Sequence, residues 1–141
     1  MDDFRTLLRR EESYAIHALI YAAENPGASA SRMAADLQMP PAFLAKVLRK
    51  LSAAHFLESK AGRNGGVTLH VDAARLSLLD IVEAVSGAVV LDTCQTMARC
   101  PTQQRLGFCR LNVAWVTTSL AIRETLDRVH LSQLFDSRSA A

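Results

Sequence analysis

The cysteines of this chain lie close together, at Cys94, Cys100 and Cys109, and residues 1–93 and 110–141 contain none. Thiolates bind soft metals and iron–sulfur clusters, and positive neighbours favour the thiolate form. No acidic residue lies between Cys94 and Cys109, whereas three basic residues lie in or directly after this segment: Arg99, Arg105 and Arg110. The spacing therefore predicts a metal, iron–sulfur or thiol-redox site.

Three uses of these thiols remain open from the residues alone. An iron–sulfur cluster suits three thiolates with positive neighbours, and the dipeptide Cys100-Pro101 also occurs in ferredoxin cysteine runs. A thiol–disulfide switch, or reduced thiols without a cofactor, is the second use. Zinc is the third, and it ranks lowest because structural zinc sites usually contain closely spaced Cys-x2-Cys pairs, which this segment lacks.

Composition limits the class of protein. The chain has 141 residues, of which 50% are hydrophobic, enough for a compact domain with a core. No apolar run approaches the length of a membrane helix, and the acidic start Met1-Asp2-Asp3 is unlike a signal peptide. We therefore expect a cytoplasmic protein with no membrane partner, in which an odd number of clustered cysteines does not form a disulfide framework.

Hydrophobic periodicity predicts the elements that must position the cysteines. The expected helices cover residues 9–24, about 29–37, 41–54, 77–86 and 111–129, followed by a short helix at 131–135. Strands at 56–60 and 67–71 flank the turn signal Gly62-Arg63-Asn64-Gly65-Gly66, which predicts a β-hairpin. Residues 92–109, with the cysteines, are expected to form a loop.

Positive charge is concentrated in the middle third of the chain. From Arg32 to Arg63 there are six basic and two acidic residues, whereas from Val67 onward there are seven of each. Such a local excess indicates a polyanionic partner. The order of helix, short helix, tight turn, basic helix and basic hairpin predicts a mainly α fold with a small β-hairpin wing, a winged helix-turn-helix. In this fold the third helix enters the major groove of double-stranded DNA.

The expected DNA contacts lie on the third helix and the hairpin. Residues near the N-terminus of that helix face base edges: Ala42, Phe43, Ala45 and Lys46. Phosphate contacts, which position the protein without reading sequence, are expected from Arg49, Lys50 and Lys60. Arg63 at the hairpin tip is expected to enter a minor groove. No catalytic arrangement stands out, so the sequence does not predict an enzyme.

These features together resemble the family of winged-helix repressors that contains the iron–sulfur regulator IscR, the nitric-oxide sensor NsrR and the iron regulator RirA. The resemblance covers nearly the whole chain and rests on residues 14–19, 43–51, 62–67 and the three cysteines, with Cys109-Arg110-Leu111 opening the final helix. It implies that Cys94, Cys100 and Cys109 ligate a 2Fe–2S or 4Fe–4S cluster. It also implies a homodimer on a palindromic operator, and the expected dimer contacts lie on the long C-terminal helix: Leu111, Trp115, Ile122 and Leu126.

The fourth cluster ligand differs from the family pattern. Asn112 stands where IscR-like members place a histidine, and Ser13 where NsrR-like members supply a carboxylate from the first helix of the partner chain. Glu12, next to Ser13, is the expected fourth ligand.

We therefore expect residues 1–75 to form the DNA-binding domain, and residues 76–141 to carry the cysteine loop and the dimerisation helix. The predicted function is a homodimeric repressor that senses iron, redox state or nitric oxide through its cluster. One alternative is a DNA-binding regulator without a cluster, switched by cysteine oxidation or by a partner protein. Another is a redox adaptor whose winged helix binds a protein instead of DNA.

Overall fold

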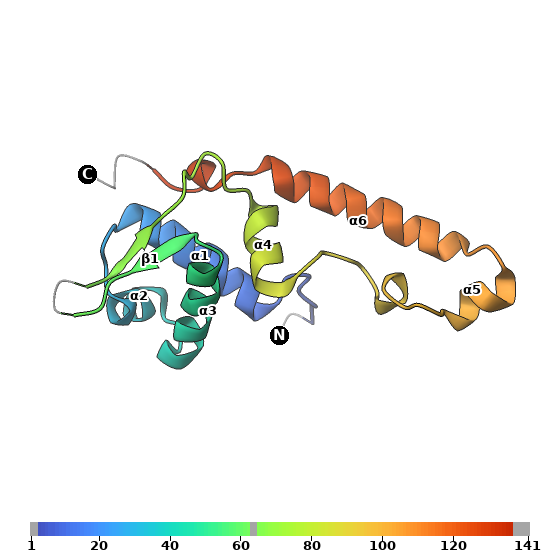
Figure 1. Ribbon diagram of the computed structural model, residues 1–141, viewed down its shortest axis with the longest axis horizontal. Helices are drawn as coiled ribbons and strands as arrows, with labels where there is room; N and C mark the ends of the chain where they lie inside the picture. Colours follow the sequence, from blue (N-terminus) through green and yellow to red (C-terminus); the bar gives the residue numbers. More distant parts are fainter. Residues whose placement is uncertain (1–2, 63–64, 137–141) are drawn as a thin grey trace.

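The computed structural model describes residues 3–62 and 65–136 of the chain. In chain order the elements are α1 (Arg10–Glu24), α2 (Ala30–Leu37), α3 (Pro41–Ala53), β1 (Leu57–Ser59), β2 (Val67–Leu69), α4 (Leu78–Ser86), the 3-10 turn η1 (Thr93–Gln95), α5 (Pro101–Leu106), α6 (Arg110–Arg128) and the 3-10 turn η2 (Leu131–Gln133). The predicted fold class, mainly α with one small hairpin, is confirmed (Figure 1).

A tight turn joins α2 to α3, as in a helix-turn-helix. The Ser29 hydroxyl accepts a hydrogen bond from the Arg32 amide at 3.1 Å and so caps α2. Gln38 ends α2 in the left-handed conformation with φ 54°, and Pro41 occupies the first turn of α3, where its missing amide proton costs nothing. His55, just after α3, is also left-handed, with φ 63°. The helices pack through buried side chains that include Met33, Met39, Leu44 and Val47.

The hairpin is fastened to the link between α1 and α2. Strands β1 and β2 pair antiparallel in the register Leu57–Leu69, and each has three residues, shorter than predicted. The Val67 amide donates to the Ala28 carbonyl at 2.8 Å, and the Gly27 amide donates to the Val67 carbonyl at 3.1 Å. A Cβ atom on Gly66 would lie 2.0 Å from the Gly27 carbonyl oxygen, so only glycine permits this close approach. Arg63 and Asn64 lie outside the described residues.

One hydrophobic core joins α1, α3 and α4. Leu19, Leu51 and Ile81 are fully buried in it, as is Leu131 near the end of the chain. The Leu131 amide donates to the Leu76 carbonyl at 2.8 Å, which ties the end of the chain to the start of α4. Residues on both sides of position 75 thus share this core, and the division at 75 remains a prediction about function.

Helix α6 extends away from the core, with α5 at its far end and η1 alongside its middle, where Gln95 contacts Ser119 (Figure 1). An ion pair between Arg123 of α6 and Glu83 of α4 joins the two helices near the core. The expectation of a loop across 92–109 was wrong in part, because η1 and α5 lie within it. Pro101 opens α5 and Gly107, with φ 76°, closes it. Among the described residues, no helix has both the length and the apolarity that crossing a membrane requires.

Candidate nucleic-acid interface and thiol cluster

Helix α3 separates a buried face from a basic exposed face. Leu44, Val47, Leu48 and Leu51 point into the core, whereas Ala42, Lys46 and Arg49 are exposed. Phe43 is half-buried and packs edge-on against Tyr14 of α1, with ring centroids 5.2 Å apart. The predicted base-facing residues therefore sit at the exposed, N-terminal end of α3, except that Phe43 also contacts α1.

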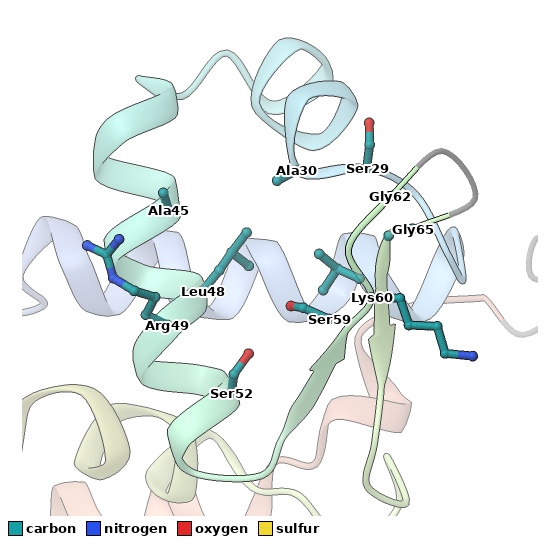
Figure 2. A pocket seen from close by; sticks show the side chains of 12 residues that line it. Ser29, Ala30, Ala45, Leu48, Arg49, Ser52, Ser59, Lys60, Gly62 and Gly65 are labelled. Carbon is teal, nitrogen blue, oxygen red and sulfur yellow. The ribbon is translucent and has the colours of Figure 1, made fainter.

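A hollow of about 530 Å³ lies between α3, the start of α2 and the hairpin. Figure 2 shows Arg49 on the α3 side and Lys60 on the hairpin side, each extending outward from the hollow. Hydroxyl groups of Ser29, Ser52 and Ser59 line the space between them. The lining is otherwise mainly apolar, with Ala45, Leu48 and Val67, so the two cations at its sides are the groups that could bind phosphate.

Lys50, also predicted to contact phosphate, faces the opposite way. Its ammonium group forms a 2.8 Å ion pair with Glu11 of α1 and donates to the Val85 carbonyl of α4 at 3.2 Å. The hydrogen bond from Lys50 is the main cause that lowers the pKa of Glu11, and the charges of Lys50, Lys46 and Arg9 add to it. Lys50 therefore has two partners inside its own chain, which a phosphate would have to displace.

Each cysteine lies at or within a short helical element of the segment. Cys94 is part of η1, Cys100 precedes α5 and Cys109 precedes α6. All three are free thiols; Cys109 is buried, whereas the other two are half-buried. Partial burial raises the pKa of Cys94, and so do the Asp92 carboxylate and the Cys100 and Cys109 thiols. A raised pKa favours the neutral thiol of Cys94, whereas the positive neighbours in the sequence had led us to expect the thiolate.

The thiols suit an iron–sulfur cluster in kind, but their ligand shell is open. Within residues 3–62 and 65–136, no three His, Cys, Asp or Glu side chains are close enough to hold a metal ion together. A polar hollow of about 330 Å³ adjoins Cys100 and is lined also by Arg99 and Gln103. Three soft donors beside positive charge fit an anionic cluster, and the thiols would have to approach one another to complete it.

Glu12 does not lie with the cysteines of its own chain. It is buried with 7% of its surface exposed, and its carboxylate accepts a hydrogen bond from the Arg9 amide at 2.9 Å, as a cap of α1. It also lines a hollow with the end of α4 and the chain that follows, including Ser86 and Leu91. Figure 1 places this end of α1 beside α4, near the middle of the molecule, whereas α5 lies at the far end of α6.

The predicted dimer residues share one face of α6, by their spacing on the helix, but differ in exposure along its length. Leu111 is 48% exposed, whereas Ile122 and Leu126 are half-buried and line the hollow that Glu12 also lines. Trp115 is half-buried, and its indole Nε1 is buried with no hydrogen-bond partner among the described residues. A second apolar stripe, which we did not predict, is exposed along α6: Val113, Val116 and Leu120. Their spacing of three and four residues in the sequence could have revealed it.

Sequence reasoning also missed Arg10 at the start of α1. Its guanidinium group lies 5.2 Å from the ring centroid of Tyr14 and 5.7 Å from that of Phe43. The spacing of Arg10 and Tyr14, four residues apart on one helix, was the available signal.

Comparisons with known proteins agree with this fold. Residues 8–137 match the model of the Rrf2 family, described as an iron-dependent transcriptional regulator. This family comprises transcriptional regulators, which confirms the prediction of a regulatory protein and not an enzyme. Protein aau3 of Rhizobium meliloti (strain 1021) is 30% identical over 136 residues, which cover 93% of this chain and 86% of that protein.

Solved structures with the same fold include regulators of two kinds. IscR of T. potens has a TM-score of 0.71 at 20% identity, covering 92% of this chain and 85% of that chain. CymR, the global cysteine regulator of B. subtilis, has a TM-score of 0.69 at 19% identity, covering 92% of this chain and 96% of that chain. At such identities the likeness shows the fold alone. Because the family model spans residues 8–137, nearly the whole sequence, the chain belongs to the Rrf2 family of winged-helix transcriptional regulators.

Proposed function

We propose that this DNA-binding regulator is a homodimeric repressor whose affinity for its operator is set by an iron–sulfur cluster on Cys94, Cys100 and Cys109. The observation that carries the proposal is the pairing of two features in one chain. A hollow flanked by Arg49 and Lys60 adjoins the recognition helix, and three free cysteines lie in the segment that precedes α6.

In the proposed complex, α3 enters the major groove by its N-terminal half. The exposed Lys46 reaches base edges there, and Ala42 and Phe43 offer apolar contact to thymine methyl groups. Arg49 and Lys60 bind phosphates on the two sides of the groove between α3 and the hairpin. Lys50 takes no direct part, because Glu11 and Val85 hold its ammonium group behind α3.

The cluster, when bound, supplies a centre that reacts with oxidants and nitric oxide. Cys94, Cys100 and Cys109 hold it, and Glu12 of the second chain is the proposed fourth ligand. Binding or loss of the cluster would move the cysteine segment, and contacts inside the chain would transmit this movement to α3. Gln95, next to Cys94, hydrogen-bonds Ser119 of α6 at 3.4 Å, and Arg123 of α6 pairs with Glu83 of α4.

Helix α4 then contacts the recognition helix directly, since the Val85 carbonyl accepts a hydrogen bond from Lys50 of α3. Drawing the thiols together displaces η1 against α6, and the displacement reaches α3 through these successive contacts. This route is a chain of bonded neighbours, and its role in signalling is part of the proposal.

A second copy of the chain is the proposed partner of α6. Val113, Val116 and Leu120 are 49%, 43% and 53% exposed in the single chain, an apolar stripe that an antiparallel or crossed mate would cover. A two-fold symmetric dimer presents two copies of α3, which is why a palindromic operator is expected.

Two substitutions on α3 test the DNA contacts. Binding is measured on duplexes selected by the wild-type protein from a randomised pool, and on scrambled duplexes. Lys46→Ala should reduce the ratio of selected to scrambled affinity, because it removes a base contact. Arg49→Ala should weaken both affinities alike, because phosphates carry no sequence. Equal loss in both variants would contradict the role of Lys46.

Anaerobic purification tests the cluster. The absorption spectrum, iron and acid-labile sulfide are measured on wild-type protein, on Cys100→Ala and on Gln103→Ala, a matched control that lies beside Cys100. Colour and iron should vanish only in Cys100→Ala. A colourless, iron-free wild-type protein after anaerobic reconstitution would reject the cluster, and a coloured Cys100→Ala would reject the ligand assignment.

The second candidate is a regulator that uses the thiols without a cluster, and the open ligand shell favours it. Here oxidation of the cysteines, or a partner protein, controls DNA binding. Mass spectrometry of iron-free protein would then detect a disulfide whose formation changes DNA affinity. For the adaptor alternative, the decisive result is partner binding that does not weaken with salt, since DNA binding must weaken steeply.

A further inference from the structure

Arg10 is the first residue of α1 and lies outside the basic segment that defines the predicted DNA surface. It is exposed, yet its side chain is fixed. Its Nε and Nη2 groups both donate to the Tyr14 hydroxyl, at 3.0 and 2.9 Å. The guanidinium group also lies 5.2 Å from the ring centroid of Tyr14 and 5.7 Å from that of Phe43. Arg10 therefore sits over the N-terminal end of the recognition helix.

The contacts leave part of the guanidinium group free for a ligand. Arginine has five N–H donors, and Tyr14 takes one from Nε and one from Nη2. Within the described part of the chain, Arg10 has no carboxylate partner, unlike Arg32, Arg75, Arg123 and Arg128. The two hydrogen bonds to Tyr14 and the two nearby rings restrain the guanidinium group, so less entropy is lost when it binds an oxygen acceptor.

The surroundings of Arg10 are positively charged. Lys50, Lys46 and Arg9 all lie close enough to Glu11 to lower its pKa, so these cations gather where α1 meets α3. Glu11 neutralises only one of them, through its ion pair with Lys50. Lys50 is held behind α3 by Glu11, whereas Arg9, Arg10 and Lys46 are exposed, so Arg9 and Arg10 extend the positive charge of α3 onto the start of α1.

We propose that Arg10 binds a DNA backbone phosphate next to the base pairs faced by Phe43 and Lys46, and so fixes how α3 is seated in the major groove. This inference rests on the proposed DNA contacts of α3. It adds α1 to the interface, so that phosphates are held on the α1 side by Arg10 and on the hairpin side by Arg49 and Lys60. The Phe43 ring, 5.7 Å from the guanidinium carbon, then helps to position Arg10 in addition to facing the bases.

The slope of log affinity against log salt concentration tests the proposal, because each phosphate contact contributes about 0.9 to its magnitude. A scrambled duplex serves as the probe. Arg10→Gln should reduce the magnitude by about 0.9 per protomer. Arg10→Lys keeps the charge but loses the planar stack, and should retain the slope with weaker binding. Arg75→Gln is the matched control, since Arg75 pairs with Asp72 away from α3, and should match wild type.

Tyr14→Phe separates phosphate binding from a purely structural role of Arg10. It removes the hydroxyl acceptor but keeps both rings and the charge, so the salt slope should stay at the wild-type value. An Arg10→Gln slope equal to that of wild type overturns the proposal, whatever its affinity. A loss of affinity for the selected duplex alone also overturns it, because Arg10 would then contact bases and not a phosphate. A wild-type protein without salt-dependent DNA binding would instead contradict the proposed function itself.

Discussion

Lys50 of α3 and Glu11 of α1 form an ion pair at 2.8 Å, and the same ammonium group donates to the Val85 carbonyl of α4 at 3.2 Å. One side chain thus joins the recognition helix to two helices behind it. The contact lies away from the exposed face of α3, so it orients the helix without occupying the proposed DNA surface. Lys50 thus positions α3 in this structure, and its predicted phosphate contact stays a prediction that would require the ion pair to open.

Glu11→Gln should destabilise the protein in a pH-dependent way. Lys50 lowers the pKa of Glu11 below its ordinary value of 4.5, so the carboxylate stabilises the fold above that value, and this stability is lost as pH falls through the lower folded pKa. Because the pair is partly exposed, we expect a loss of only about 0.5–1 kcal/mol at neutral pH. Urea unfolding at a series of pH values should show the difference closing in acid. Glu124→Gln, at an exposed pair with Arg128, should show almost no difference at any pH.

Tyr21→Phe should weaken the attachment of α2 to α1. The Tyr21 hydroxyl donates to Asp36, and burial followed by this bond raises the pKa of Tyr21 above its ordinary value of 10.0. A raised folded pKa means stability that is present below the ordinary value and lost as pH rises through the folded value. We expect a loss of about 1 kcal/mol at neutral pH, and a smaller further loss in alkali than wild type shows. An equal loss of stability at alkaline pH in wild type and Tyr21→Phe would argue against a raised pKa of Tyr21 as its cause.

Gly66→Ala should distort the hairpin where the turn enters β2. The added Cβ would meet the Gly27 carbonyl oxygen at 2.0 Å, so either the link between α1 and α2 or the strand must move. We expect about 1–3 kcal/mol of destabilisation and weaker DNA binding, measured by thermal unfolding and by titration. Gly62→Ala is the control: nothing lies within 4 Å of its Cβ, and only its φ of +101° opposes the substitution. It should cost less than Gly66→Ala.

Leu120→Asp should prevent assembly of two chains. Leu120 is 53% exposed in the single chain, so the substitution leaves the fold intact but places a charge in the proposed dimer contact. Sedimentation should show a dimer for wild type and for Leu120→Met, and a monomer for Leu120→Asp. A Leu120→Asp protein that sediments as a dimer would move the interface to another face of α6.

Elements governed by local signals were predictable from the sequence. The stop at Asn25-Pro26-Gly27 and the turn before Pro41 fixed the limits of α1 and α3, because these residues act on the backbone next to them. Helix α5 was missed, since its six residues have no apolar face to reveal a period. The cysteine spacing indicated thiol chemistry. Whether the three thiols lie close enough to share a metal depends on how η1, α5 and α6 pack, which the spacing does not reveal.

Contacts between distant residues were not predictable. Lys50 carries the charge expected of a phosphate ligand, but its ammonium group already binds Glu11 and the Val85 carbonyl. Both lie far from Lys50 in the sequence. Arg10 reaches Phe43 only because α1 packs across α3. Charge counts along the chain identify a basic segment, whereas packing decides which of its cations remain available.

Gln38 and His55, which stand before and after α3, have φ of 54° and 63°. Residues other than glycine hold this left-handed conformation at a cost of roughly 1 kcal/mol or more. Glycine at either position should therefore raise the unfolding temperature, and neither residue lines the groove or the thiol segment. The thermal stability of the protein can thus be increased at these two positions. Adding these glycine substitutions to a destabilised variant of α3 should restore enough stability for its DNA binding to be measured.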